Sequence, residues 1–496
     1  MVAESVFGNT TVTAPSTATE DTAPSTHQPV ATFSAMNLPD ALLNGLTEMG
    51  YTTPSPIQQS AIVPALLGRD VMCTSETGSG KTAAFLIPVC AKLLEEKKQQ
   101  QIARRDGPIA PCDLRLAICG QPRAVILAPT RELASQIAKQ ATKLCAQQLD
   151  RIACVVVYGQ VSKKRQTKQM VAARGKPLLL VATPGRLKDF VESGVVSLSH
   201  VKYVVLDEAD RMLDNGFRRD TTALINGMMT QAQGRQTLLF SATFPPAIRT
   251  VAEAYVRTDN TVRVTVGDVN ATAKNVVQHF VESRPDKTSK LGHLVELLQS
   301  EAGRVRHKTL VFIQKKRDVK DFAKLLAAGG VAVEEVEEVA GRDGPHRRPS
   351  WPKWYKTGPS FSPVTDVCQL HGDVSQPARE KALAHFADGT CSVMLATDAA
   401  GRGLDIKGVT HVIIVDLPTT RLQFENYVHR IGRTGRAGAT GKATSLYVPG
   451  FDSANCNGPI AKQLLHALSG PPSTSVPDYI REDAESTRTK NKKKDR

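Results

Sequence analysis

The chain has 496 residues, of which 41% are hydrophobic and 22% are charged, and its formal net charge is +15 at pH 7. This length gives room for roughly two to four domains, and the composition is that of a globular protein. The excess of Lys and Arg indicates an anionic partner such as nucleic acid or a membrane surface. No uninterrupted apolar run is long enough to cross a bilayer, so we expect no membrane-spanning segment.

The first part of the chain lacks the features of an export signal. No Lys or Arg precedes Arg69, so neither the basic start of a secretory signal nor an Arg-rich transit peptide is present. The nine cysteines are scattered and form no Cys-x-x-Cys pair, and several lie inside apolar runs. This usage is typical of buried thiols in a reducing compartment, so we expect the protein in the cytoplasm or the nucleus.

Residues 1–30 are rich in Thr, Ser, Ala and Pro and contain few large apolar side chains. Such a segment buries too little surface to offset the entropy of the chain. We therefore expect a disordered N-terminal tail, with order beginning near Phe33.

A glycine-rich stretch follows the short apolar run Val71–Cys73 and leads into a helical pattern. It reads Ser75-Glu76-Thr77-Gly78-Ser79-Gly80-Lys81-Thr82. Small residues let backbone N–H groups close on phosphate oxygens, Lys81 can reach the β- and γ-phosphates, and the Thr82 hydroxyl can hold Mg2+. The strict pattern begins with Gly, where this chain has Ser75, so the stretch alone also fits a glycine-rich turn before an ordinary helix.

Short apolar runs then alternate with helical patterns. Runs that are apolar on both faces and alternate with helices predict parallel strands in a covered sheet, and hence an α/β fold. The pattern starts again after a polar stretch, which predicts a first domain at 31–262, a linker at 263–275 and a second domain at 276–450. The runs are Ala124–Leu127, Cys154–Val157, Leu178–Val181, Tyr203–Leu206 and Thr237–Phe240, then Thr309–Ile313, Ser392–Leu395 and His411–Val415.

Two segments stand outside this pattern. Residues 334–366 interrupt the second domain and contain both tryptophans, Trp351 and Trp354. This insertion could stack on bases, dock a partner, or fold back on its own domain. Residues 451–496 form a C-terminal extension with a basic tail. We expect disorder from about Ser469, and its basic end is a solvated tail, a nuclear localisation signal or an RNA-contact arm.

Two carboxylates, Asp207 and Glu208, come directly after the run that ends at Leu206. In an open α/β sheet, ligands bind at the carboxyl ends of the strands. A carboxylate at such a strand end typically holds Mg2+ in a phosphate-loop protein, and Asp207 fits this role. Glu208 is then placed to orient and deprotonate an attacking water.

An ordered set of short motifs runs from Phe33 to about Pro449. Its members are Phe33 with Gly50, Pro54 and Ile57-Gln58; Pro129-Thr130-Arg131-Glu132-Leu133-Ala134; Thr183-Pro184-Gly185-Arg186; Asp207-Glu208-Ala209-Asp210; Ser241-Ala242-Thr243; Gln376-x-x-Arg379; Ala396-Thr397-Asp398; Arg402-Gly403-Leu404-Asp405; and His429-Arg430-Ile431-Gly432-Arg433-Thr434-Gly435-Arg436. This set resembles the DEAD-box RNA helicases of superfamily 2, which are named after the motif at Asp207. Within that family the pattern is most similar to the Vasa-like branch.

The resemblance implies two tandem RecA-like domains, ATP and Mg2+ as cofactors, and a role for each motif residue at the nucleotide. Gln58 reads the adenine edge and Phe33 stacks on the base, while residues 75–82 cradle the phosphates. Asp405 contacts the ribose, and Arg433 and Arg436 are arginine fingers from the second domain. The implied catalytic set is Lys81, Asp207, Glu208, Arg433 and Arg436; the metal ligands are Thr82 and Asp207; and Ser241, Thr243 and His429 couple the nucleotide state to domain closure.

The resemblance also implies that the partner is RNA, held by its backbone irrespective of sequence. Short polar groups, backbone amides and Arg suit contacts to phosphates and 2′-hydroxyls. The implied RNA-binding residues are Pro129, Thr130, Arg131, Gly159, Thr183, Pro184, Gly185 and Arg186 in the first domain and Arg379, Thr397 and Asp398 in the second.

Four residues depart from the family pattern. Ser75 stands where Ala is usual, Glu76 replaces the commoner Gln, and Gly401 replaces Ala. Gln160 replaces the second Gly of a pair thought to approach RNA, which puts the role of Gly159 in doubt. None of these changes removes a catalytic group.

We therefore expect a monomeric ATP-dependent RNA helicase that binds single-stranded RNA, separates short duplexes or remodels ribonucleoproteins, and hydrolyses ATP to ADP and phosphate. An ATP-gated RNA clamp that barely unwinds would use the same motifs. A DNA helicase is a further alternative, and so is a phosphate-loop kinase, although a kinase leaves the second domain unexplained. Protein partners would bind through the tails or the 334–366 insertion.

Overall fold

The computed structural model describes residues 10–13, 29–76, 78–105, 120–146, 152–173, 176–214, 216–228, 233–267, 275–301, 307–328, 333–334, 367–398, 406, 408–420, 423–435, 439–468 and 476–492. The chain divides into two compact units, residues 1–269 and residues 270–496.

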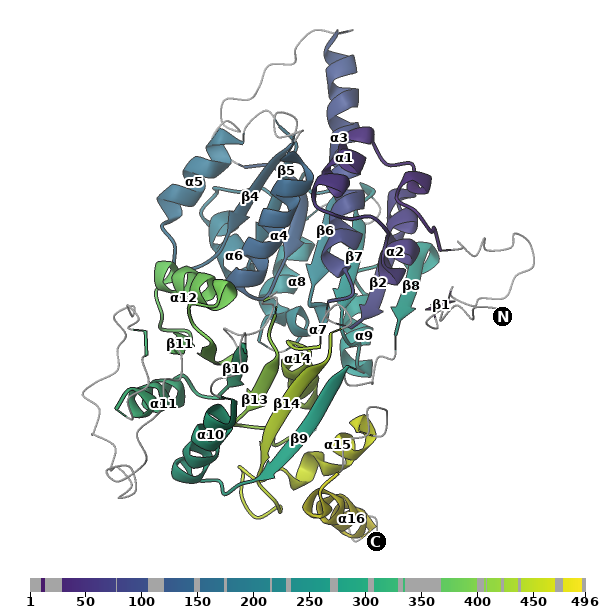
Figure 1. Ribbon diagram of the computed structural model, residues 1–496. Helices are drawn as coiled ribbons and strands as arrows, with labels where there is room; N and C mark the ends of the chain where they lie inside the picture. Colours follow the sequence, from purple (N-terminus) through teal and green to yellow (C-terminus); the bar gives the residue numbers. More distant parts are fainter. Residues whose placement is uncertain are drawn as a thin grey trace, which may run out of the picture. The chain divides into compact units, whose positions relative to one another are not determined.

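The first unit is built on an eight-stranded sheet with the strand order β1-β8-β2-β7-β6-β3-β5-β4 (Figure 1). Neighbouring strands run parallel except for β1 and β8, which confirms the expected α/β fold with a mostly parallel sheet. The strands are β1 (Thr10–Thr13), β2 (Asp70–Ser75), β3 (Pro122–Leu127), β4 (Ala153–Val157), β5 (Leu178–Ala182), β6 (Tyr203–Asp207), β7 (Gln236–Ser241) and β8 (Thr261–Val266).

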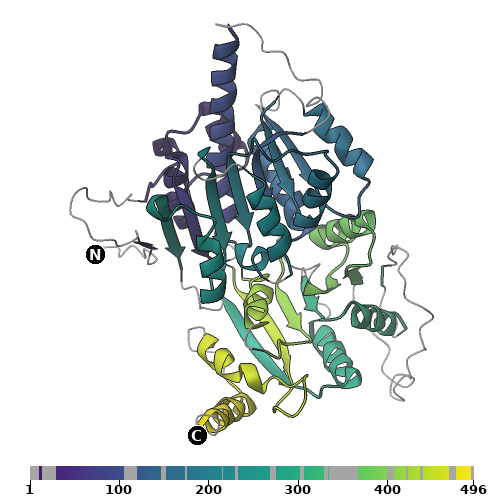
Figure 2. The same cartoon turned by 180° about the vertical axis from the view of Figure 1, so that it is seen from behind.

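Helices cover both faces of this sheet (Figures 1 and 2). Side chains alternate along each strand, so Val71 and Cys73 pack beneath α1–α4 while Met72 packs on the opposite face beneath α5–α9. Both faces of the sheet are therefore buried, which explains why the sequences of these strands are continuous apolar runs. The helices are α1 (Asp40–Glu48), α2 (Pro56–Leu66), α3 (Lys81–Arg105), α4 (Arg131–Leu144), α5 (Lys163–Ala172), α6 (Pro184–Glu192), α7 (Ala209–Met212), α8 (Arg218–Asn226) and α9 (Pro246–Glu253).

The second unit has a six-stranded, wholly parallel sheet with the order β11-β12-β10-β13-β14-β9. Helices α10 and α11 pack on one face, and α12, α14, α15 and α16 pack on the other. Its strands are β9 (Val276–Glu282), β10 (Thr309–Phe312), β11 (Val367–Leu370), β12 (Val393–Ala396), β13 (His411–Ile414) and β14 (Gly441–Tyr447). Its helices are α10 (Lys287–Glu301), α11 (Lys316–Ala328), α12 (Gln376–Asp388), α14 (Phe424–Ile431), α15 (Ala461–Ala467) and α16 (Asp478–Lys492).

The first unit extends beyond the ends expected from the sequence. Thr10–Thr13, inside the tail expected to be disordered, form β1 and pair antiparallel with β8. Three of these four residues are Thr and the other is Val, and such β-branched side chains favour strands. Strand β8 continues to Val266, past residue 262 where the first domain was expected to end. All of its residues pair with β2, so they belong to the sheet and not to a linker.

The C-terminal extension is part of the second unit. The expectation of disorder from about Ser469 is wrong for α16, which places Ile480 and Ala484 in the core, one turn apart. Asp483 on the same helix accepts hydrogen bonds from the Tyr447 hydroxyl and the Gly450 N–H, both at 2.8 Å. The basic composition of the tail hid this short apolar stripe. Most of the insertion expected at 334–366, with Trp351 and Trp354, lies outside the described residues.

None of the helices in the described ranges is both long and apolar enough to span a bilayer. The seven cysteines in those ranges are all free thiols, and six of them are buried.

The carboxylate of Asp70 fixes the start of β2 and is wholly buried. It accepts hydrogen bonds from the backbone N–H groups of Thr237 and Arg257 and pairs with the Arg257 guanidinium at 3.0 Å. It thus joins β2, β7 and the segment before β8.

We expect Asp70→Asn to lower the free energy of unfolding by about 3 kcal/mol, because it leaves Arg257 without its buried counter-charge. The matched control is Glu253→Gln, which breaks the exposed 2.8 Å pair with Arg263 and should cost less than about 1 kcal/mol. Urea unfolding of both variants measures the difference, and equal losses would contradict the structural role of Asp70.

Candidate functional site

The glycine-rich stretch forms the turn between β2 and α3. Gly78 and Gly80 have φ of +85° and +98°, which side chains other than glycine rarely adopt. A Cβ at Gly80 would also lie 2.5 Å from the Gln58 side-chain nitrogen. The loop therefore needs glycine at this position for both its conformation and its packing. Thr77 lies outside the described residues.

Two polar contacts hold this loop in shape. The hydroxyls of Ser75 and Ser79 are hydrogen-bonded to each other at 2.7 Å, so the departure from Ala at position 75 adds a bond inside the loop. The Lys81 ammonium donates to the carbonyl oxygens of Ser75 and Glu76, at 2.7 and 2.8 Å. Lys81 is thus hydrogen-bonded to its own loop at the start of α3.

The acidic motif lies at the end of β6, separated from β2 by β7 alone. Asp207 is buried, and its carboxylate accepts the Glu208 N–H at 3.0 Å. Glu208 has φ of +52° and ψ of +53°, a left-handed conformation that is unusual for a residue with a side chain. Its Oε2 is buried and has no hydrogen-bond partner among the described residues. Strain and an unsatisfied oxygen at one residue indicate a functional group rather than a helix cap.

The charges of these residues interact. Burial, and after it the neighbouring Glu208 carboxylate, raise the pKa of Asp207 to about 7, although Lys81 opposes both effects. Burial lowers the pKa of Lys81, and Asp207, Asp210 and Glu208 counteract this. Because three carboxylates face one partly desolvated ammonium, binding of a further cation would stabilise the site.

The motif Ser241-Ala242-Thr243 contacts the acidic motif directly. The Asp210 N–H donates to the Ser241 hydroxyl at 3.3 Å, and the Thr243 hydroxyl donates to the Asp210 carboxylate at 2.9 Å. Coupling roles were expected for Ser241 and Thr243, but no role was expected for Asp210, the residue that both contact. Its only sequence signal was its place in the acidic motif.

Gln58, on α2, lies beside the glycine-rich loop, and Phe33 precedes this helix in the chain. The Gln58 side chain caps this helix by accepting the Ser55 N–H at 2.9 Å, and it donates to the Gly80 carbonyl at 3.1 Å. Phe33 is 6% exposed and meets Tyr51 edge-on, with ring centroids 6.4 Å apart. Gln58 therefore links the residues expected to read adenine to those expected to hold phosphate.

The expected RNA-side residues of the first unit gather at the carboxyl ends of β3, β4 and β5. Thr130 caps α4, and Arg131 donates from its guanidinium to the Gln160 side chain. Gln160 has φ of +63°, so it keeps a glycine-like conformation although the family's Gly is missing. A Cβ at Gly159 or Gly185 would meet no atom within 4 Å, so the loops at both positions are open to close approach.

Arg186 is engaged within the protein. Its guanidinium donates to the Val161 carbonyl at 3.0 Å and to the Gln166 side chain at 2.8 Å. It also lies over the Phe190 ring, 5.6 Å from the centroid. Thr183 and Pro184 start the same helix, α6, in whose first turn Gly185 and Arg186 lie. Arg186 thus fastens two of these loops together.

In the second unit the expected RNA-side residues are also held by neighbours. The Arg379 guanidinium is buried and donates to the His371 carbonyl at 3.0 Å. Asp398 forms a two-pronged pair with Arg430, with both contacts at 2.6 Å, and Thr397 is buried beside it. Arg430, which sequence reasoning gave no role, is therefore what positions Asp398.

Arg433 and His429 lie at the end of α14 in the second unit. Arg433 is 4% exposed, and its Nε donates to the His429 carbonyl at 3.2 Å. Asp405 and Arg436, expected at the ribose and the γ-phosphate, lie outside the described residues.

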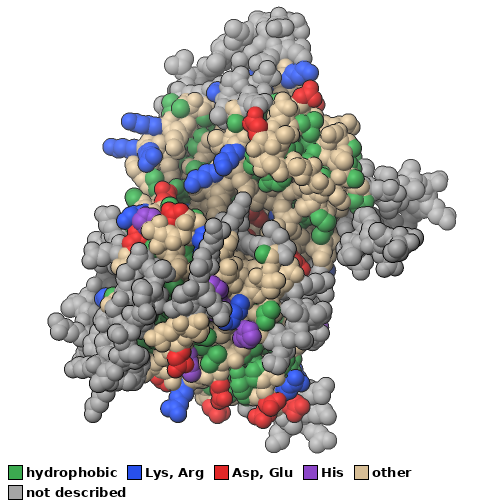
Figure 3. Space-filling model, in the orientation of Figure 1, with side chains coloured by type: hydrophobic (Ala, Val, Ile, Leu, Met, Phe, Trp, Pro, Cys, Tyr) green, Lys and Arg blue, Asp and Glu red, His purple; other side chains and the backbone are tan. Residues whose placement is uncertain are grey.

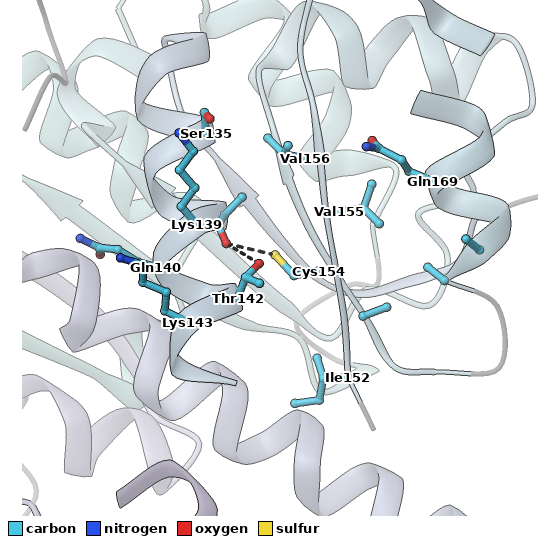
Figure 4. Close-up of a pocket in the computed structure, with 14 residues that line it drawn as sticks. Ser135, Lys139, Gln140, Thr142, Lys143, Ile152, Cys154, Val155, Val156 and Gln169 are labelled. Carbon is cyan, nitrogen blue, oxygen red and sulfur yellow. Dashed lines mark hydrogen bonds between the residues drawn. The ribbon is translucent and has the colours of Figure 1, made fainter. Parts of the chain in front are cut away.

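A separate hollow of about 740 Å³ lies at the edge of the first sheet, between α4, β4 and α5 (Figure 4). Thr142 and Cys154 both donate to the Ala138 carbonyl there, at 2.9 and 3.8 Å. None of the residues expected to bind nucleotide lines it.

Comparison with known proteins identifies the motifs. Residues 55–251 match the DEAD/DEAH box helicase family model, and residues 360–438 match the model of the helicase conserved C-terminal domain. The chain belongs to the DEAD/DEAH box helicase family. The first range contains the phosphate loop and the acidic motif at Asp207. The second range contains the motif residues from Arg379 to Arg433.

Several curated DEAD/DEAH box relatives are similar over most of the chain. The Drosophila melanogaster ATP-dependent RNA helicase vasa is 37% identical over 454 residues, which are 92% of this chain and 58% of vasa. The Mus musculus ATP-dependent RNA helicase DDX4 is also 37% identical, over 92% of this chain and 56% of its own length. This confirms the resemblance to the Vasa-like branch. The chain spans little more than half the length of these relatives.

Solved structures confirm two RecA-like units of the DEAD-box kind. Saccharomyces cerevisiae Dbp5 bound to RNA and ADP BeF3 matches with a TM-score of 0.65 at 24% identity, over 92% of this chain and 99% of Dbp5. Mss116p bound to ssRNA and AMP-PNP matches with a TM-score of 0.65 at 26% identity, over 84% of this chain and 75% of that chain.

The raised pKa of Asp207 predicts a pH-dependent stability of the ligand-free protein. Between the ordinary value of 3.8 and about 7, the folded chain keeps a proton that the unfolded chain releases, so the stability contribution of this residue falls as pH rises. Asp207→Asn should therefore be more stable than wild type at about pH 8 and equal to it at about pH 4. Thermal unfolding without nucleotide and Mg2+ measures this, and a variant that is less stable at the higher pH would contradict it.

Proposed function

We propose that the chain is an ATP-dependent RNA helicase that hydrolyses ATP to ADP and phosphate while it binds single-stranded RNA. The observation that carries this proposal is the placement of the phosphate loop and three carboxylates at neighbouring strand ends of one sheet, where their charges shift one another's pKa values. The similarity to vasa and DDX4, which are ATP-dependent RNA helicases, supports the activity, and the complexes of Dbp5 and Mss116p support RNA and ATP as ligands.

The residues of the first unit suit binding and hydrolysis of ATP. Backbone N–H groups of the loop at 78–82 would bind phosphate oxygens, and Lys81 would leave its carbonyl partners for the β- and γ-phosphates. Glu208, with an unpartnered buried Oε2, would accept the proton of the attacking water. Gln58 would hold the adenine edge, for which its contact with Gly80 already places it beside the loop.

The donor set also suits a magnesium ion. The Thr82 hydroxyl and the buried Asp207 carboxylate are the oxygen ligands that phosphate-loop proteins offer to this ion, and the carboxylates around Asp207 give the site an excess of negative charge. When bound, Mg2+ neutralises the charge that develops on the phosphate oxygens.

RNA binding would use the open loops after β3, β4 and β5. Gly159 and Gly185 leave room for a backbone to approach, and Thr130 and Arg131 offer a hydroxyl and a guanidinium beside them. These groups bind phosphates and 2′-hydroxyls and do not read bases, so we expect little sequence preference.

Glu208→Gln tests the assignment of the general base. The amide cannot accept a proton, so ATP turnover in the presence of RNA should fall by about 10² to 10⁴ while ATP and RNA affinities stay near wild type. Glu253→Gln, at an exposed carboxylate of the same unit, is the control and should leave turnover unchanged. Unimpaired turnover of the Glu208 variant would refute this role.

Arg433→Lys tests the proposed arginine finger. Lysine keeps the charge but loses the planar fork, so turnover should fall by about 10³ to 10⁵ if Arg433 stabilises the γ-phosphate in the transition state. Arg284→Lys, at an exposed position of the second unit, is the control. Because Arg433 is buried, urea unfolding of the variant must first show wild-type stability. Turnover within tenfold of wild type in a stable variant would remove Arg433 from the catalytic set.

Strand separation distinguishes the helicase from the clamp. A short labelled duplex should be separated with ATP and not without it, and RNA should stimulate hydrolysis more than DNA of the same sequence. Negligible separation with slow release of products would assign the chain to the clamps instead.

A further inference from the structure

Helix α5 exposes several basic side chains to solvent. Lys164, Arg165 and Lys168 are exposed, and the helix contains no Asp or Glu. Lys163 pairs with Asp189, but no ion pair joins the other three to a described residue. Figure 3 shows Lys and Arg side chains gathered at the edge of the first unit where Figure 1 places α5.

A second pair of cations lies across the hollow shown in Figure 4. Lys139 and Lys143 are exposed, stand one turn apart on α4, and line this hollow without an ion pair to any described residue. On the other side, Gln169 and Ala172 of α5 line it, each four residues after Arg165 and Lys168. Residues four apart share one face of a helix, so the cations of α5 continue the wall of the hollow.

The floor of the hollow is apolar. It consists of the edge strand β4 and the residue before it, with Ile152, Cys154, Val155 and Val156 contributing side chains. We call the hollow, together with Lys139, Lys143, Lys164, Arg165 and Lys168, the α4–α5 groove.

Helix α5 is fixed rigidly to the loops expected to hold RNA. Gln166, which is 3% exposed, donates to the Tyr158 carbonyl at 3.1 Å and accepts from Arg186 at 2.8 Å. Tyr158 immediately precedes Gly159, and Arg186 lies in the first turn of α6, just after the loop that follows β5. The exposed cations of α5 therefore have a set position relative to both loops.

We propose that the α4–α5 groove binds the backbone of single-stranded RNA that extends beyond the nucleotides held by the loops after β3, β4 and β5. The inference rests on the proposed function, which supplies the strand. Five exposed cations without acidic partners match a row of phosphates, and the apolar floor can cover the faces of bases without reading them. RNA is favoured over an acidic protein segment because α5 starts only three residues after Gln160, which contacts Arg131.

The test compares RNA affinity across strand lengths and salt concentrations. Lys164→Glu/Lys168→Glu in the full chain should bind the shortest strand that wild type binds with unchanged affinity. For longer strands, in a series from about 4 to about 16 nucleotides, affinity should fall and the slope of log K against log salt should drop by about 1.4. Lys164→Gln/Lys168→Gln should show the same length dependence with a smaller loss, and it serves if the charge reversal impairs folding.

The control is Lys98→Glu/Arg249→Glu, which makes the same change of net charge at exposed positions on α3 and α9 of the same unit. Equal losses in the control, or a loss that does not depend on strand length, would overturn the proposal. Polyglutamate that competes as well as RNA of equal charge would assign the groove to an acidic protein. Failure of the wild-type protein to bind RNA of any length would instead overturn the proposed function. If the Lys164→Glu/Lys168→Glu variant binds long strands weakly but keeps normal ATP turnover on the shortest strand, the groove proposal and the proposed function are both supported.

Discussion

The first unit depends on the electrostatic balance between one lysine and the carboxylates at neighbouring strand ends. Lys81 is partly desolvated, and its charge is tolerated because Asp207, Asp210 and Glu208 lie near it. Asp207 in turn is held in a buried position where its ionised form is disfavoured. Lys81 also donates hydrogen bonds to the carbonyl oxygens of Ser75 and Glu76, and Asp207 accepts one from the Glu208 N–H. Three carboxylates face one ammonium, so the site carries more negative than positive charge.

The hydrogen bonds around this balance connect loops that are far apart in sequence. Gln58 ties α2 to Gly80 of the phosphate loop, and Asp210 ties the acidic motif to Thr243. The phosphate loop is thus linked to α2, and the acidic motif is linked to the residues after β7. Asp398 and Arg430 form a similar link inside the second unit.

On the RNA side, two of the residues expected to contact RNA also form hydrogen bonds within their own unit. The guanidinium groups of Arg186 and Arg379 donate hydrogen bonds to carbonyl oxygens of their own unit. These bonds hold segments of each unit in place, while a Cβ at Gly159 or Gly185 would meet no atom within 4 Å. The departure at Gln160 fits the same division, because its side chain holds Arg131 while its backbone keeps the conformation of a glycine.

The sequence determined the two α/β units, the phosphate loop and the order of the motifs, because parallel strands covered on both faces read as apolar runs and polar residues must follow their carboxyl ends. It did not determine the partners of those polar residues. The burial of Asp207, the strained backbone of Glu208, and the clamps formed by Gln166 and Arg430 depend on contacts between loops that no local pattern records. For the same reason β1 and α16 escaped prediction: β1 is too short and α16 is too polar to be recognised alone, and each is stabilised by a strand or core of the folded unit.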